Sequence, residues 1–180
     1  DGLKGTGDLV ITITADQNTA GLGMIYETNL THDAEANNAT NTSVVSAAVP
    51  YADLTTTQVS APVSAIGGSA ITIGWNVSNR GQAATSANAW TDEIILSIDG
   101  VFGNSDDLVL GSIRHQGALA VGENYSQTAT VNLPRLADGR YYVAVRSDAN
   151  TEVLQPDTRA DTISASLPID LAAAFADLGV

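Results

Sequence analysis

A clean alternation in the segment Ser69–Asn79, in which apolar side chains from Ile71 to Val77 are separated by polar residues or glycine, constrains the fold of this chain more than any other feature. Every second residue is apolar, so an extended strand would gather these side chains on one face. They are Ile71, Ile73, Trp75 and Val77. Turn-forming residues follow directly, ending at Gly81. The segment is therefore predicted to be a half-buried strand, with Trp75 as a core anchor between two sheets.

Strand-like runs recur along the whole chain, with Gly, Asn, Asp and Pro between them. They cover residues 9–14, 42–49, 54–59, 93–98, 108–113, 125–133, 140–146 and 162–167. Many short strands separated by turns predict an all-β fold, an antiparallel β-sandwich of about seven strands. Its predicted core includes Leu54, Val59, Ile71, Ile73, Trp75, Ile95, Leu110, Val131, Tyr142 and Ala144. Residues 170–178 are ambiguous, because they could form a short helix or begin the first strand of another domain.

Charge and composition exclude several classes of function. The net charge is −13 and the pI is about 4.1, so a cationic face for nucleic acid or for an anionic membrane is not expected. The acidity has two open explanations, solubility or acidic loops neutralised by divalent cations. Cysteine is absent, which weakly favours a bacterial product, and no apolar stretch reaches the roughly 18 residues of a membrane span.

An internal repeat carries most of the prediction of domain organisation. Residues 8–16 resemble residues 140–148, because each is an alternating strand that ends at Asp and reaches Asn two residues later. Residues 42–46 then resemble residues 163–166, and residues 50–54 resemble residues 168–171. The three matches occur in the same order. The predicted domains are residues 1–48, the trailing strands of a preceding repeat; residues 49–168, a complete sandwich; and residues 169–180, the start of a following repeat or a linker.

The order of several short motifs resembles the CARDB family, the cell-adhesion-related domains found in bacteria. The motifs are Ala52-Asp53-Leu54, Trp75-Asn76-Val77-Ser78-Asn79-Arg80-Gly81, Trp90-Thr91-Asp92, Asp106-Asp107-Leu108, His115-Gln116-Gly117 and Gly139-Arg140-Tyr141-Tyr142-Val143. The resemblance implies an immunoglobulin-like β-sandwich, often in tandem, in large bacterial surface or secreted proteins. It therefore implies an extracellular or cell-surface location. The two copies of the internal repeat differ at one position, where the first has Glu27 and the second has Gln155.

A loop between two predicted strands gathers several oxygen-bearing side chains. Asp99, Asn104, Asp106 and Asp107 lie within nine residues, and glycines between them would let the backbone fold around an ion. Calcium binds six to eight oxygens from carboxylates, amides and carbonyls, so these four residues are the predicted calcium ligands. The spacing is not that of an EF-hand. The alternative is a polar turn whose Asp and Asn side chains bind their own backbone.

A second, more dispersed set of oxygen ligands could hold calcium at a junction between domains. It consists of Asp16, Asn18, Glu27, Asp33, Glu35, Asn37 and Asn38. Other chemistry has little support. His32 and His115 are the only histidines and lack partners at zinc spacing, and the G-x-S-x-G motif of a serine hydrolase is absent. No catalytic residue and no organic cofactor is predicted, so the chain is not expected to be an enzyme.

The expected function is that of a spacer or adhesion-stalk module in an exported repeat protein, in contact with neighbouring repeats or with copies of itself. A cell-surface or matrix ligand is a further expected partner. Two alternatives stay open, beside a weaker third in which the chain is an accessory domain of an enzyme. One is a filament subunit joined by strand complementation at an exposed sheet edge. The other is a carbohydrate- or protein-binding sandwich whose ligand face would use Trp90, Tyr26 and Tyr51. Trp90 could be either a buried lid or an exposed contact.

Overall fold

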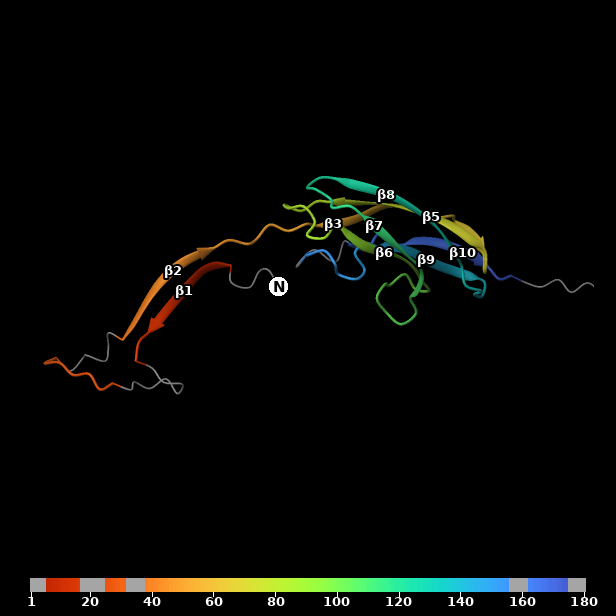
Figure 1. The fold of residues 1–180 in the computed structure, drawn as a ribbon. Helices are drawn as coiled ribbons and strands as arrows, with labels where there is room; N and C mark the ends of the chain where they lie inside the picture. Colours follow the sequence, from red (N-terminus) through yellow and green to blue (C-terminus); the bar gives the residue numbers. More distant parts are fainter. Residues whose placement is uncertain (1–5, 17–24, 32–37, 156–161, 175–180) are drawn as a thin grey trace, which may run out of the picture. The chain divides into compact units, whose positions relative to one another are not determined.

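The computed structural model describes residues 6–16, 25–31, 38–155 and 162–174. Every regular element among these residues is a β-strand, which confirms the predicted all-β fold (Figure 1). The chain divides into two compact units, an N-terminal unit of residues 1–49 and a C-terminal unit of residues 50–180. None of the described residues belongs to a helix that could cross a membrane.

The N-terminal unit contains one antiparallel pair of strands, β1 (Gly7–Thr14) and β2 (Ala39–Ser46). Leu9 lies opposite Val44 in this pair. The alternation of Leu, Ile and Thr along β1 is typical of a strand, as predicted from the sequence.

The C-terminal unit is a sandwich of two sheets, as expected for an immunoglobulin-like domain. One sheet has the order β3 (Leu54–Ser60), β5 (Ala70–Asn79) and β8 (Asn124–Asn132). The other has the order β4 (Ser64–Ile66), β10 (Leu167–Ala172), β9 (Gly139–Arg146), β6 (Ala89–Ser97) and β7 (Leu108–Gln116). Neighbouring strands are antiparallel except β4 and β10, which run parallel.

The chain enters and leaves this sandwich at opposite ends. Leu54, the first residue of β3, lies opposite Asn79 at the last residue of β5. At the far end of β5, Gly67 precedes the strand by three residues and its N–H donates to the carbonyl of Ala172, the last residue of β10 (2.8 Å). The whole length of β5 therefore separates the point of entry from the point of exit (Figure 1).

The core lies between the two sheets and confirms much of the prediction. Trp75, Leu54, Ile71, Ile73 and Val131 are buried, and Val59 and Leu110 pack against them in part. The predicted strand alternation therefore holds along β5, where Trp75 is only 3% exposed.

Of the core residues predicted on β6 and β9, Ile95 and Ala144 are buried, as expected, whereas Tyr142 is only partly buried. On β9 the residues in the core cluster are Tyr141, Val143 and Val145, so the expected Tyr142 is not among them. On β6 they are Trp90, Ile94 and Leu96, so Ile95 is not in the cluster either. Ile95 and Ala144 lie opposite each other in the sheet. The physical reason for these differences is that both strands contain consecutive apolar residues, whose alternation has no phase.

A hydrogen bond fixes the corner that leads into β9. The hydroxyl of Tyr141 donates to the carbonyl of Ala137, four residues earlier, at 3.2 Å. Tyr141 is 8% exposed and Ala137 is exposed, so this bond is only partly shielded from water. The same arrangement, called a tyrosine corner, marks the equivalent turn of immunoglobulin-like sandwiches.

The last strand crosses the expected domain boundary at residue 168. β10 occupies residues 167–172, and its Ile169 and Leu171 are 0% and 4% exposed. Residues 169–172 thus belong to this sandwich, rather than to a following repeat or linker. The strand expected at residues 162–167 begins only at Leu167, and within the earlier part Ile163 forms an isolated bridge with Arg146.

Candidate functional site

A buried carboxylate joins the two sheets of the sandwich. Asp92 lies on β6 in phase with Trp90 and Ile94, so its side chain points into the core and is 1% exposed. One carboxylate oxygen, Oδ2, accepts hydrogen bonds from the indole N–H of Trp75 (2.9 Å) and from the hydroxyl of Tyr125 (2.6 Å). Trp75 and Tyr125 lie on β5 and β8 of the opposite sheet.

The environment of Asp92 shifts the titration of the groups around it. Burial raises the pKa of Asp92, although the hydrogen bonds from Tyr125 and Trp75 act in the opposite direction. Burial also raises the pKa of Tyr125, and the negative charge of Asp92 adds to this effect. Tyr125 therefore keeps its proton and acts as a hydrogen-bond donor toward the carboxylate.

An aromatic cluster continues the network toward β7. The indole N–H of Trp90 donates to the hydroxyl oxygen of Tyr125 at 3.1 Å, and His115 stacks on the Tyr125 ring with centroids 3.8 Å apart. Burial lowers the pKa of His115. Trp90 is 0% exposed, which resolves its position: it is a buried residue and cannot form part of an open ligand face.

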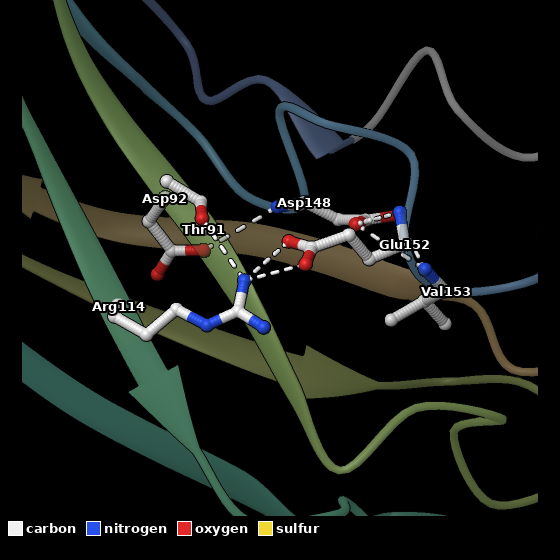
Figure 2. A network of polar contacts seen from close by, with 6 residues as sticks. All are labelled: Thr91, Asp92, Arg114, Asp148, Glu152 and Val153. Atoms are coloured by element: carbon white, nitrogen blue, oxygen red, sulfur yellow. Dashed lines mark hydrogen bonds and ion pairs between the residues drawn. The ribbon is translucent and has the colours of Figure 1, made fainter.

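A tight turn after β9 anchors the other side of Asp92. Asp148 has a φ of 49°, a left-handed conformation that is uncommon outside glycine, and its N–H donates to Asp92 Oδ1 at 3.4 Å. The Asp148 carboxylate in turn accepts the backbone N–H groups of Glu152 (2.7 Å) and Val153 (3.2 Å). Figure 2 shows this chain of contacts, in which the Asp148 carboxylate closes the turn on itself.

An ion pair covers the outer side of the same turn. The Arg114 guanidinium contacts the Glu152 carboxylate at 2.5 Å and donates to the Thr91 hydroxyl at 3.1 Å (Figure 2). The Arg114 side chain is 45% exposed, so solvent screens the pair. The interaction with Arg114 lowers the pKa of Glu152.

Two buried amide side chains fix the place where the chain enters the sandwich. Gln155 is 1% exposed; it accepts the N–H of Leu54 at 2.8 Å and donates to Asp148 at 3.2 Å. Asn79 is 0% exposed, accepts the N–H groups of Asp53 and Gly81, and donates to two carbonyl oxygens. Both amides therefore bind the backbone on which β3 begins.

The chemistry of this network is structural. The carboxylates of Asp92 and Asp148 and the amides of Asn79 and Gln155 bind other groups of the same unit, and all four side chains are almost fully buried. A buried polar group is stable when it is hydrogen bonded in this way. The network fixes the spacing of the sheets and the turn at one end of the sandwich, and its groups are not presented to a substrate.

The predicted calcium ligands lie together in one loop, where they bind that loop. Asp99 accepts the N–H of Val101 at 2.8 Å and an amide hydrogen of Asn104 at 3.2 Å. Asp106 accepts the N–H of Ile98 at 3.0 Å, and Asp107 accepts the N–H of Gly103. One oxygen, Asp107 Oδ1, is buried without a hydrogen-bond partner among the residues that the structure covers.

Within the described ranges, no three acidic or histidine side chains gather closely enough to hold a metal ion. Calcium binding at Asp99, Asn104, Asp106 and Asp107 stays a prediction. Of the second predicted set, Asn18, Asp33, Glu35 and Asn37 lie outside the described residues, as does His32. The Asp16 carboxylate accepts the N–H of Ile25 at 2.8 and 2.9 Å.

The sequence contained a signal for the central carboxylate that the prediction did not use. Asp92 stands at a place in the alternation otherwise held by Trp90, Ile94 and Leu96. A carboxylate in phase with buried apolar residues must find hydrogen-bond partners inside the protein. No such pattern pointed to Asp148 or Gln155, because both follow β9 and lie outside the strands, where side chains do not alternate.

The sheet order, the tyrosine corner and the buried network define the C-terminal unit as an immunoglobulin-like β-sandwich module. The family model named CARDB matches residues 51–162, more than half of the chain. The protein therefore belongs to the CARDB family, an adhesion-related domain family, as the sequence resemblance implied.

Several solved structures are similar to this chain at low sequence identity. A crystal structure of the CARDB domain of a Pyrococcus furiosus protein, in complex with di-metal ions, has 13% identity and a TM-score of 0.45, and the match covers 68% of this chain and 90% of that chain. A solution NMR structure of the same domain has 13% identity and a TM-score of 0.49, with 69% and 98% covered. β-Glucosidase 3B from Thermotoga neapolitana has 12% identity and a TM-score of 0.46, with 70% of this chain but 17% of the enzyme covered. No curated protein sequence matches.

Proposed function

We propose that the chain is a non-enzymatic extracellular repeat module that acts as a spacer or adhesion stalk in a bacterial surface or secreted protein. The observation that carries the proposal is the placement of the chain's entry and exit at opposite ends of the sandwich, at Leu54 and Ala172. Modules connected through such ends add their lengths. β5 has ten residues, so each module contributes about 30 Å, at about 3.4 Å per residue.

The polar groups of the sandwich support a structural role. Asp92, the best-placed group for acid–base chemistry, is buried in the core and hydrogen bonded to Trp75 and Tyr125, and the half-buried His115 is stacked on Tyr125. A general acid or base must reach a bound substrate within hydrogen-bond distance. The high negative charge supports an exported location because it keeps a displayed protein soluble. Membership of an adhesion-related family points the same way.

The test is the length of linked copies. Proteins that contain one, two and four copies of the full chain are expected to show a maximum dimension, measured by small-angle X-ray scattering, that grows by a constant increment of at least about 30 Å per copy. A matched control is the single chain at increasing concentration, which should stay monomeric in sedimentation. Collapse of the four-copy protein to a compact particle would contradict a spacer, and growth of the single chain into filaments would favour the filament alternative.

Calcium at the loop of residues 99–107 is a second part of the proposal, in which the ion would stiffen the module. The support is the oxygen-rich composition of the loop and the buried, unpartnered Oδ1 of Asp107. A cell-surface or matrix ligand is the remaining proposed partner, and binding of the monomeric chain to matrix components measures it.

A further inference from the structure

The N-terminal unit exposes an apolar face on its two strands. Leu9, Ile11 and Ile13 share one face of β1, and Val44 lies opposite Leu9 on the same face of β2. Their exposed fractions are 37%, 49%, 66% and 44%. A single antiparallel pair of strands is marginally stable in water, because it cannot bury such a face alone.

The end of β1 repeats the geometry found at the end of β9. Asp16 and Asp148 each follow their strand by two residues, and each adopts the left-handed conformation, with φ of 51° and 49°. Each carboxylate also accepts the N–H of an apolar residue, Ile25 in one case and Val153 in the other. This conformation is uncommon for non-glycine residues, and its recurrence with the same acceptor role supports an equivalence of the two strands.

This equivalence aligns the exposed face of the N-terminal unit with a buried face of the sandwich. Leu9, Ile11 and Ile13 take the places of Tyr141, Val143 and Val145, which are between 0% and 8% exposed. The cross-strand pairs place Val44 opposite Leu9 as Ile169 lies opposite Tyr141, so β2 corresponds to β10. This structural alignment replaces the sequence matches of residues 42–46 with 163–166 and of residues 50–54 with 168–171. Ile25 is 65% exposed, whereas its counterpart Val153 is fully buried.

We propose that β1 and β2 are the last two strands of a second CARDB-type sandwich, and that a segment equivalent to β3–β8, supplied by a preceding repeat, covers their apolar face. In the C-terminal unit, the sheet β3-β5-β8 supplies this cover and β6 pairs with the outer edge of β9. Among the described residues, β1 pairs only with β2, so the edge equivalent to the one that meets β6 is open.

A second copy of this chain does not fit the face equally well. The sandwich of the C-terminal unit already contains β9 and β10, and β9 is flanked by β6 on one side and β10 on the other. A further pair of the same kind would have no open place beside β6 in that sheet. The preferred occupant is therefore a six-stranded segment that lacks its own last two strands. The inference rests on the proposed organisation in serial repeats.

The experiment supplies this segment from the chain itself. A copy of residues 51–138 is placed directly before Gly7, because Gly7 holds the position of Gly139 at the start of the equivalent strand. The matched control carries a copy of residues 51–174 at the same point, so that its added sandwich already has all its strands. Hydrogen exchange is measured by mass spectrometry for residues 9–14 in both proteins and in the original chain.

Exchange in β1 is expected to slow by about a hundredfold or more with residues 51–138 added, and to stay fast in the other two proteins. In the slowed protein, Ile11→Asp should restore fast exchange, whereas Val10→Asp on the opposite face should not. Fast hydrogen exchange of β1 in all three proteins would overturn the proposal. Protection in the original chain together with dimerisation would also overturn it, in favour of a second copy. Neither result depends on whether linked copies extend, so a failure here is distinct from failure of the spacer function.

Discussion

The indole N–H of Trp75 donates a 2.9 Å hydrogen bond to the carboxylate of Asp92, and the bond crosses from one sheet of the sandwich to the other. Tyr125 donates to the same oxygen. The core between the sheets thus has a directional link in addition to its apolar contacts. Directional links specify one packing arrangement of two sheets when all their members are satisfied.

Asp92→Ala is expected to lower the free energy of unfolding by about 2–4 kcal/mol, because it leaves the buried donors of Trp75 and Tyr125 without an acceptor. Urea unfolding followed by tryptophan fluorescence measures the change. Glu93→Ala is the matched control on the same strand, and its partly exposed side chain should cost about 0.5 kcal/mol or less. Equal losses in the two variants would show that the inter-sheet bonds contribute nothing specific.

The stability of the protein is expected to fall as the pH drops through the titration of His115. Burial lowers the pKa of His115 below its ordinary 6.5, so the unfolded chain takes up the proton first. The contribution is present above about pH 6.5 and is lost as the pH falls toward the folded-state pKa. Urea unfolding at about pH 7.5 and about pH 5.5 should show a larger loss for the natural chain than for His115→Gln. The same loss in both would assign the pH dependence to other groups.

Tyr141→Phe is expected to cost about 1 kcal/mol, because it removes the hydrogen bond to Ala137 without changing the packing of the ring. The neighbouring Tyr142→Phe provides the control, since that ring lies outside the core cluster and its loss of a hydroxyl should be nearly neutral. Thermal or urea unfolding compares the two. A neutral Tyr141→Phe would mean that the corner is held by the ring and the backbone alone.

Gly81→Ala is expected to destabilise the sandwich by about 2–3 kcal/mol through overpacking. A Cβ at this position would lie 2.3 Å from the Tyr51 carbonyl oxygen and 2.6 Å from the Asp53 nitrogen, and backbone atoms cannot rotate away. At Gly139 the nearest atom to an added Cβ is 3.6 Å distant, so Gly139→Ala serves as the tolerated control. Comparable midpoints of urea unfolding for the two variants would contradict the steric argument.

The calcium prediction implies that the melting temperature rises by several degrees when millimolar calcium replaces a chelator, since an ion bound only to the folded state stabilises it. Asp107→Asn should reduce the increase, because Asp107 is a predicted ligand with one unpartnered oxygen. Magnesium at the same concentration controls for ionic strength. Identical melting temperatures in calcium and in chelator, with no metal retained after dialysis, would show that the loop does not bind calcium.

The sequence predicted the fold well where apolar residues alternate singly and less well where they cluster. Along β5 each apolar residue has polar neighbours, so the period of two also carries its phase, and Ile73 and Trp75 were placed in the core. Along β6, Ile94, Ile95 and Leu96 are consecutive, so their order cannot say which of them faces inward. Ile94 and Ile95 are both buried, and they lie on opposite faces of the sheet.

The polar network could be predicted only in part. Asp92 was visible as a carboxylate within an apolar phase, but its partners Trp75 and Tyr125 come from a different sheet and are distant in sequence. The role of Asp148 depends on its left-handed backbone conformation, which the alternation of side chains does not predict. Long-range pairing and local backbone conformation arise from tertiary packing, which periodicity does not encode.

The short parallel pairing of β4 with β10 would resist a force that pulls the two ends of the sandwich apart. Tension draws β4 back toward the point of entry and β10 forward toward the point of exit, so the strands slide against each other along their length. The hydrogen bonds between residues 64–66 and 170–172 are then strained together, in shear, instead of opening one after another. The β4–β10 contact would thereby resist extension of the module together with the pairing of β3 with β5.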